Sequence, residues 1–101
     1  MNLQQLEYIV ALDTHRHFVK AAQSCGVSQP TLSTLITRLE EELDVTIFDR
    51  SSHPIKPTTI GEKLIAQARV TLFHLSQFKE ISLSERELNA GQRRVLLPSV
   101  L

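Results

Sequence analysis

The stretch HFVKAAQSCGVSQPTLSTLITRL, residues 17–39, predicts two short helices joined by a tight turn. Residues 18–25 place apolar side chains at helical spacing, and two adjacent alanines among them would let another helix approach closely. Gly26 follows the last apolar residue, where glycine suits the left-handed conformation that ends a helix. Val27 can fold back as the apolar contact of the turn, so the first helix is expected to end at about residue 25.

Ser28 is expected to begin the second helix, because its hydroxyl can accept a hydrogen bond from the backbone N–H of Thr31. Pro30 falls in the first turn, where its missing N–H costs nothing. The apolar residues that follow form one stripe: Leu32, Leu35, Ile36 and Leu39. The remaining faces carry short polar side chains and one arginine, which suit base edges and phosphates: Gln29, Pro30, Thr31, Ser33, Thr34, Thr37 and Arg38.

A second helix of this kind, taken alone, is also compatible with a well-capped amphipathic helix that binds nothing. The pairing of two helices, the short turn containing glycine and the local charge favour a DNA-reading element. Between Thr14 and Leu39 the chain carries Arg16, Lys20 and Arg38 and no acidic residue.

The composition predicts a small, mainly α domain, because the 101 residues are 42% apolar and include few aromatic residues and no tryptophan. A single cysteine excludes an intramolecular disulfide, and no ligand cluster accompanies it, so we expect neither a metal nor a cofactor. No apolar run has membrane-spanning length, and the N-terminal MNLQQLEY lacks the order of a signal peptide. We therefore expect a soluble cytoplasmic protein with no membrane partner.

The net charge is zero, which argues against a protein that coats DNA through its cations alone. Four of the eleven acidic residues lie in EEELD, residues 40–44, directly after the predicted reading face. Affinity would then have to come from base contacts, from DNA shape and from more than one copy of the domain. The charge distribution thus favours a selective binder that acts as a dimer or larger assembly.

An apolar pattern over residues 3–13 predicts a first, structural helix with Asn2 as its N-cap. Gln4, Gln5 and Glu7 are expected to face solvent, whereas the pattern leaves Tyr8 open between the rim of the core and the surface.

Two histidines, His15 and His17, lie near Cys25 in sequence and raise the question of a metal site. A helix places Cys25 on the core face, and the turn supplies no further ligand. The histidines are therefore interpreted as polar turn residues.

The segment DRSSHPIKPTT, residues 49–59, contains two prolines and two serines before Thr58 and cannot be helical. Extended pieces at residues 46–49 and 55–57 are predicted to pair as a small ribbon, or wing. Between Arg50 and Ile60 there is no acidic residue, so the wing suits the phosphate backbone or a minor groove, although a solvated turn remains the alternative. Its polar and basic residues are Arg50, Ser51, Ser52, His53 and Lys56.

A long helix is predicted over residues 59–88, opened by the capping-box pair Thr59 and Glu62. No proline or glycine interrupts residues 62–90, which as a helix would be roughly 40 Å long, more than a three-helix core can cover. Part of its apolar stripe should therefore meet another chain, giving a symmetric homodimer through residues 59–88. The alternative is a helix that packs wholly within its own domain.

The sequence accordingly predicts three parts. Residues 1–58 form a winged helix-turn-helix DNA-binding domain, and residues 59–88 form the linker and dimerisation helix. Residues 89–101 begin with the polar break NAGQRR and end in the apolar run VLLPSVL, for which no strand partner precedes. We expect these last residues to be a hinge and the start of an absent effector-binding domain.

From Met1 to about Ser99 the chain resembles the N-terminal DNA-binding part of a LysR-type bacterial transcriptional regulator. The resemblance rests on LEYIVAL, F-x-x-AA, VSQPTLS, LITRLEEEL, the IFDR that opens the wing and PT-x-x-G. LEYIVAL, HRHF and SCGVSQPTLS further resemble the OxyR branch, whose members respond to peroxide through a pair of cysteines in the C-terminal domain. Peroxide sensing by a full-length protein is thus implied by analogy alone.

The resemblance implies a winged helix-turn-helix that reads an interrupted palindrome, linker helices that pair two protomers, a tetramer in the full-length protein and a small-molecule effector bound by the absent domain. By position, it implies base or adjacent phosphate contacts from the start of the second helix, backbone contacts from Thr37 and Arg38, and further contacts from the wing. Thr34 and His53 stand where many relatives have arginine or another longer polar residue, so these two positions depart from the family pattern in base preference and wing contact. Asp44 replaces a common glycine, and aspartate tolerates the left-handed geometry. The expected DNA-binding residues are Ser28, Gln29, Pro30, Thr31, Ser33, Thr34, Thr37, Arg38, Arg50, Ser52 and His53.

Two other functions remain as alternatives to a transcriptional regulator. In the first, residues 59–88 are a dimerisation module and the helix pair is only scaffold. In the second, the chain is a small enzyme, but its histidines and Cys25 offer no nucleophile with an adjacent base and an orienting acid, and no glycine loop could hold a phosphate. We therefore expect no catalytic role and double-stranded DNA as the partner.

Overall fold

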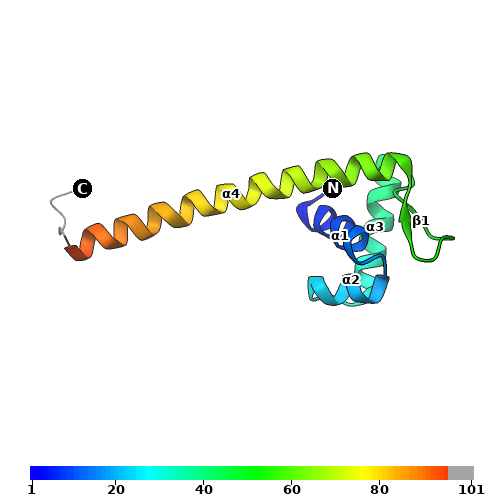
Figure 1. The fold of residues 1–101 in the computed structure, drawn as a ribbon, viewed down its shortest axis with the longest axis horizontal. Helices are drawn as coiled ribbons and strands as arrows, with labels where there is room; N and C mark the ends of the chain where they lie inside the picture. Colours follow the sequence, from blue (N-terminus) through cyan, green and yellow to red (C-terminus); the bar gives the residue numbers. More distant parts are fainter. Residues whose placement is uncertain (96–101) are drawn as a thin grey trace.

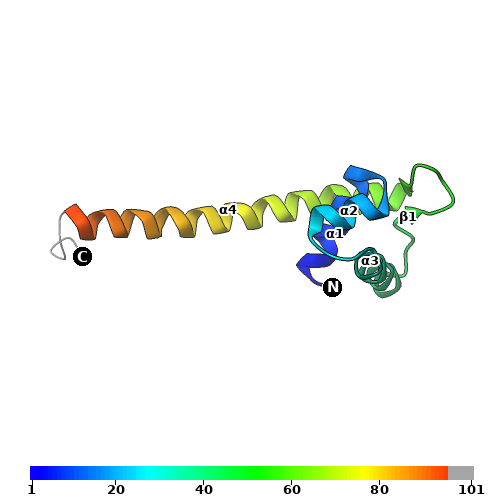
Figure 2. The same cartoon turned by 90° about the horizontal axis from the view of Figure 1, so that it is seen from below.

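The computed structural model describes the backbone of residues 1–95 and the surroundings of the side chains up to residue 90. Figure 1 shows the first three helices and a two-stranded ribbon gathered at one end of a long helix, whose far part extends away from them. The same separation is visible from below (Figure 2), and the molecule measures 64 × 24 × 20 Å. The elements are α1 (Leu3–His15), α2 (Phe18–Cys25), α3 (Gln29–Leu43), β1 (Phe48–Asp49), β2 (Lys56–Pro57) and α4 (Thr59–Val95).

The start of α1 follows the prediction at its cap and departs from it at Gln5. The Asn2 side chain accepts from the backbone N–H of Gln5, and the Gln5 side chain accepts from the N–H of Asn2, both at 2.9 Å. The prediction that Gln5 faces solvent was wrong, because this capping box folds its side chain inward, where it is 5% exposed. Its amide also donates to the carbonyl of Leu35 at 3.1 Å and so ties α1 to α3.

The turn between α2 and α3 has the predicted construction. Gly26 adopts a left-handed conformation with φ 68°, and its N–H donates to the Gln23 carbonyl at 3.1 Å. The Val27 N–H donates to the Ala22 carbonyl at 3.1 Å, which completes the end of α2. Ser28 then caps α3 by accepting from the N–H of Thr31 at 3.3 Å. Local chemistry therefore fixes the turn that holds α3 against α2.

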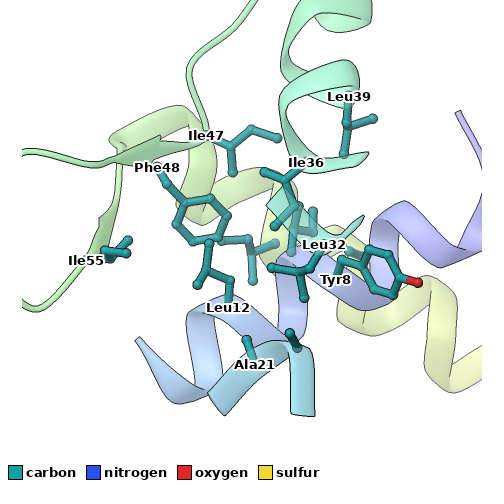
Figure 3. Close-up of a cluster of buried hydrophobic side chains, with 13 residues drawn as sticks. Tyr8, Leu12, Ala21, Leu32, Ile36, Leu39, Ile47, Phe48 and Ile55 are labelled. Atoms are coloured by element: carbon teal, nitrogen blue, oxygen red, sulfur yellow. The ribbon is translucent and has the colours of Figure 1, made fainter. Parts of the chain in front are cut away.

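The hydrophobic core lies among α1, α2, α3, the ribbon and the first turns of α4 (Figure 3). Tyr8, which the sequence left open, is 3% exposed and belongs to this core. Leu35 is only half-buried and packs against the core from its edge. The buried apolar residues are Tyr8, Ile9, Leu12, Ala21, Ala22, Leu32, Ile36, Leu39, Ile47, Phe48, Ile55, Ile65 and Ala68. Beyond Ala68, the described part of α4 contributes nothing fully buried to the core.

The predicted ribbon is confirmed: β1 and β2 pair antiparallel, with Phe48 opposite Pro57 and Asp49 opposite Lys56. The predicted cap of α4 was wrong by one residue. Thr58, and not Thr59, accepts from the backbone N–H of Gly61 at 3.0 Å, and its hydroxyl donates to the carbonyl of Thr46 at 2.5 Å. Thr58 takes this role because its hydroxyl and its N–H donate to the carbonyls of Thr46 and Ile47, just before β1, and so fix its position.

The long helix is longer than expected. The polar break predicted at residues 89–94 was wrong, because α4 continues through them to Val95. One glycine without a proline costs a helix only about 1 kcal/mol, and helix-forming residues flank it. The division of the chain at residue 88 remains a prediction. The expected start of an effector-binding domain, in the run from Val95 onward, lies outside the described residues apart from Val95 itself, which is helical.

Candidate nucleic-acid interface

The exposed face of α3 brings together most of the predicted DNA-binding residues. A groove of about 310 Å³ follows this face, lined by Pro30, Thr31, Thr34, Leu35 and Arg38. Ser33 alone among the predicted residues of α3 and its cap is half-buried. The exposed ones are Ser28, Gln29, Pro30, Thr31, Thr34, Thr37 and Arg38. This surface is exposed and mainly polar, and none of these residues is acidic.

Two hydroxyls at the start of α3 are already engaged with each other. The Ser28 and Thr31 oxygens lie 2.9 Å apart, while Ser28 also caps the helix. Both remain exposed, so a phosphate at this helix N-terminus would meet their hydroxyls together with backbone N–H groups. Arg38, one turn beyond Thr34, takes part in no ion pair within the described residues.

Gln29 and His53 are far apart in sequence and line the same groove. This groove, of about 430 Å³, lies between the start of α2, the start of α3 and the wing. Its remaining lining residues are Arg16, His17, Phe18, Val19, Pro54 and Ile55. His17 caps α2, where its Nδ1 accepts from the N–H of Lys20 at 3.2 Å. The reading helix and the wing thus present polar groups to one concave surface.

Arg50, predicted to contact DNA from the wing, has partners within the protein. Its Nη2 lies 2.9 Å from Glu40 Oε1 and its Nη1 lies 3.3 Å from Glu40 Oε2. Its Nη1 also donates to the Phe48 carbonyl at 3.4 Å, and the guanidinium carbon lies 6.0 Å from the centre of the Phe18 ring. Sequence reasoning missed this role because it placed Glu40 in an acidic cluster outside the reading surface.

The rest of the wing is more mixed in charge than predicted. Ser52 is half-buried, while His53 and Lys56 are exposed. Asp49 adds a negative charge opposite Lys56, and hydrogen bonds from the hydroxyl and the backbone N–H of Ser51 lower its pKa below the usual 3.8. Asp49 is therefore ionised at neutral pH and holds the turn through Ser51.

A second engaged arginine lies between α1 and α2. Arg16 has a left-handed backbone with φ 53°, and its Nη2 lies 2.8 Å from Asp13 Oδ1. The other Asp13 oxygen accepts from Arg69 of α4 at 2.8 Å. No local sequence signal could have found this pair, because Asp13 and Arg69 are 56 positions apart.

The two ends of α3 differ in charge. Its C-terminal end is lined on one side by Glu40, Glu41 and Asp44, around a groove of about 380 Å³ that also includes Arg50. Asp44 ends the helix with φ 55°, which agrees with the expectation that aspartate tolerates this geometry. A helix N-terminus favours anions, whereas acidic side chains repel them. The first turns of α3, and not its last, are therefore the side that suits a phosphate backbone.

Residues 3–62 match a family model described as "Bacterial regulatory helix-turn-helix protein, lysR family". The chain belongs to the LysR family. It is 45% identical, over 101 residues, to the "DNA-binding transcriptional dual regulator OxyR" of Escherichia coli, a match that covers 99% of this chain and 33% of that protein. The chain thus spans about a third of the length of this LysR-family relative.

Solved LysR-family structures share the fold. A full-length OxyR variant from Pseudomonas aeruginosa matches with a TM-score of 0.80 and 43% identity, covering 83% of this chain and 28% of that one. The BenM DNA-binding domain in complex with benA site 1 DNA matches with a TM-score of 0.78 and 35% identity, covering 87% and 97%. The winged helix-turn-helix followed by a long helix is thus the architecture of LysR-family DNA-binding domains.

No group of three or more histidine, cysteine or acidic side chains is arranged to hold a metal ion in the described part of the chain. Across the same part of the chain, no helix combines the length and the apolar character that a membrane crossing needs. Cys25 is half-buried at the end of α2, with its sulfur 3.9 Å from the Ser24 hydroxyl oxygen.

Proposed function

We propose that this chain is the sequence-specific DNA-binding part of a LysR-type transcriptional regulator and has no catalytic role. The observation that carries the proposal is the acid-free polar face at the start of α3, which is exposed and held by a helix-turn-helix. The names of its relatives and the DNA complex of the similar BenM domain support the same assignment.

In this proposal the first turns of α3 enter the major groove. Gln29 is the best candidate for base reading, because its amide can form a bidentate contact with adenine that contributes about 1–3 kcal/mol of discrimination. Thr31 and Thr34 meet bases or adjacent phosphates, and Arg38 contacts the phosphate backbone. Ser52 and His53 bring the wing to the flanking DNA.

We further propose that two chains pair through residues 59–88. Beyond Ala68, most apolar residues of this span lie open to solvent, and Phe78 and Ile81 are each 72% exposed. Large exposed apolar patches favour contact with another protein. The exposed apolar residues are Val70, Phe73, Phe78, Ile81, Leu83 and Leu88. A symmetric dimer would read two half-sites of an interrupted palindrome.

For the whole protein we propose a cytoplasmic regulator that assembles as a tetramer and receives its signal through an effector domain outside this chain. The peroxide-inducible activators among its relatives suggest a redox signal. The family resemblance implies a pair of cysteines for such a signal, and this chain contains one, Cys25.

Selection of binding sites from random duplex DNA at physiological salt tests the proposed function. Enrichment of an inverted repeat is expected, since a dimeric reader selects two related half-sites. A folded dimer that enriches no sequence would contradict the assignment and favour the dimerisation-module alternative.

Two substitutions separate base reading from phosphate contact. Gln29→Ala is expected to relax the preference at one base pair of each half-site. Arg38→Ala should instead weaken binding to all sequences alike and make the slope of log affinity against log salt concentration shallower by roughly one. Both are measured by titrating labelled operator and single-base variants at several salt concentrations. An unchanged base preference in Gln29→Ala, or a loss confined to the operator in Arg38→Ala, would reverse these roles.

A further inference from the structure

Glu40 is the least exposed member of the acidic run and connects α3 to the start of the ribbon. Its side chain is 11% exposed, and its Oε2 accepts from the backbone N–H of Ile47 at 2.7 Å and of Phe48 at 3.3 Å. These N–H groups belong to the segment that leads into the wing. One carboxylate on the reading helix therefore fixes the point at which the wing begins.

Arg50 closes the same arrangement from the other side. Its guanidinium meets both oxygens of Glu40, bonds the Phe48 carbonyl and lies over the Phe18 ring of α2. A bidentate arginine–carboxylate pair fixes orientation as well as distance. The pair thus joins α3, β1 and α2 at the base of the wing.

We propose that Glu40 and Arg50 are positioning residues that set the wing relative to the reading helix, and that Arg50 acts on DNA through the wing and not as a phosphate ligand. This inference rests on the proposed DNA-binding function. Arg50 already makes three hydrogen bonds to oxygen atoms of the protein, and the adjacent Glu40 carboxylate offsets its positive charge, which weakens its attraction for a phosphate. The groups left to contact flanking DNA are then those farther out on the wing, around His53.

Glu40→Gln tests the inference, because the two possible roles of Arg50 predict different changes in affinity for DNA. The amide oxygen can still accept from the wing backbone, but the ion pair with Arg50 is lost. If Arg50 is a positioning residue, affinity for the selected operator falls roughly tenfold, and hydroxyl-radical protection is lost at the flanks but retained over the half-site centres. If Arg50 contacts phosphate directly, removal of its competing acid leaves affinity unchanged or raises it, which would overturn the inference.

Glu41→Gln is the matched control. It removes the same charge from the neighbouring position, where the side chain is exposed and makes no hydrogen bond or ion pair in the described part of the chain. Its affinity should equal or slightly exceed that of the unaltered chain. An equal loss of affinity in both variants would show that the effect is not specific to the Glu40–Arg50 pair and would also overturn the inference.

Arg50→Lys supplies a second test that does not depend on Glu40. Lysine retains the charge that a phosphate needs but cannot form the bidentate pair. Positioning predicts a loss of affinity and of flank protection like that in Glu40→Gln, with an unfolding midpoint close to that of the unaltered chain; near-normal binding would contradict it.

Amide hydrogen exchange without DNA separates this inference from the function on which it rests. Faster exchange confined to residues 47–57 is expected in Glu40→Gln, and unchanged exchange there would overturn the positioning role even if DNA binding is normal. Absence of sequence selection by the unaltered chain would instead refute the proposed function, and the inference would fall with it.

Discussion

Gly61 shows how one residue determines the way α4 joins the reading head, which is the winged helix-turn-helix that precedes α4. A Cβ atom added at this position would lie 2.0 Å from the carbonyl oxygen of Ile47. That oxygen also accepts from the N–H of Thr58 at 2.8 Å, so it has little freedom to move. The backbone of α4 therefore packs directly against the backbone that leads into β1.

We expect Gly61→Ala to lower the free energy of unfolding by about 1–3 kcal/mol, the usual cost of overpacking. Alanine normally stabilises a helix by roughly 0.5–1 kcal/mol relative to glycine, so the expected sign is opposite to that of helix propensity. Urea unfolding followed by circular dichroism measures the change. A more stable variant would show that the contact with Ile47 relaxes freely.

How far sequence predicts a residue's role depends on the distance to its partner. Asn2, Gly26 and Ser28 were predicted in their roles because a cap is completed within a few residues. Gln5 was misplaced for two reasons: its capping box with Asn2 is a local pattern that was overlooked, and its other partner, Leu35, is 30 positions away. The role of Glu40 was missed since a run of acids gives no sign of which carboxylate faces the protein.

At the scale of elements, the type of each helix and strand followed from local pattern, whereas the C-terminal end of α4 did not. The ribbon was predicted because prolines exclude a helix between two apolar pieces. The end of α4 was not, because a glycine in a polar segment weakens a helix without stopping it. That Gln29 and His53 line one groove depends on how the elements pack together, and a local sequence pattern does not contain this information.

Asp13 is the polar link between α1 and α4, and its removal should loosen their contact. Its side chain is 18% exposed and pairs with Arg69, which is 46% exposed, and with Arg16. We expect Asp13→Asn to lower the free energy of unfolding by up to about 1 kcal/mol per pair, with the difference shrinking at high salt. Chemical unfolding at two salt concentrations measures this.

Glu7→Gln is the control for that substitution, because Glu7 is exposed on the same helix and forms no ion pair within the described residues. It should leave stability nearly unchanged at both salt concentrations. If Asp13→Asn lowers the free energy of unfolding equally at low and high salt, the loss would come from packing and not from charge.

At the scale of the whole molecule, the far part of α4 carries large apolar side chains that are left exposed. Phe78→Lys is expected to convert a dimer into a monomer, because it places a charge at the centre of the proposed helix pairing. Sedimentation equilibrium measures the mass, and operator titration should show a matching loss of affinity. Gln77→Lys adds the same charge at a neighbouring exposed position and should leave the dimer intact. A dimer that tolerates Phe78→Lys would place the pairing surface elsewhere.

The close contact at Gly61 gains importance from the length of the helix it starts. A helix of 37 residues is about 55 Å long, so a rotation of about 5° at its first turn displaces its far end by about 5 Å. Successive base pairs are about 3.4 Å apart along the DNA axis. In a dimer joined through α4, a small angular error at this joint would become a mismatch of more than one base pair between the reading heads. The glycine contact would then act as the angular reference from which the spacing of the two half-sites is measured.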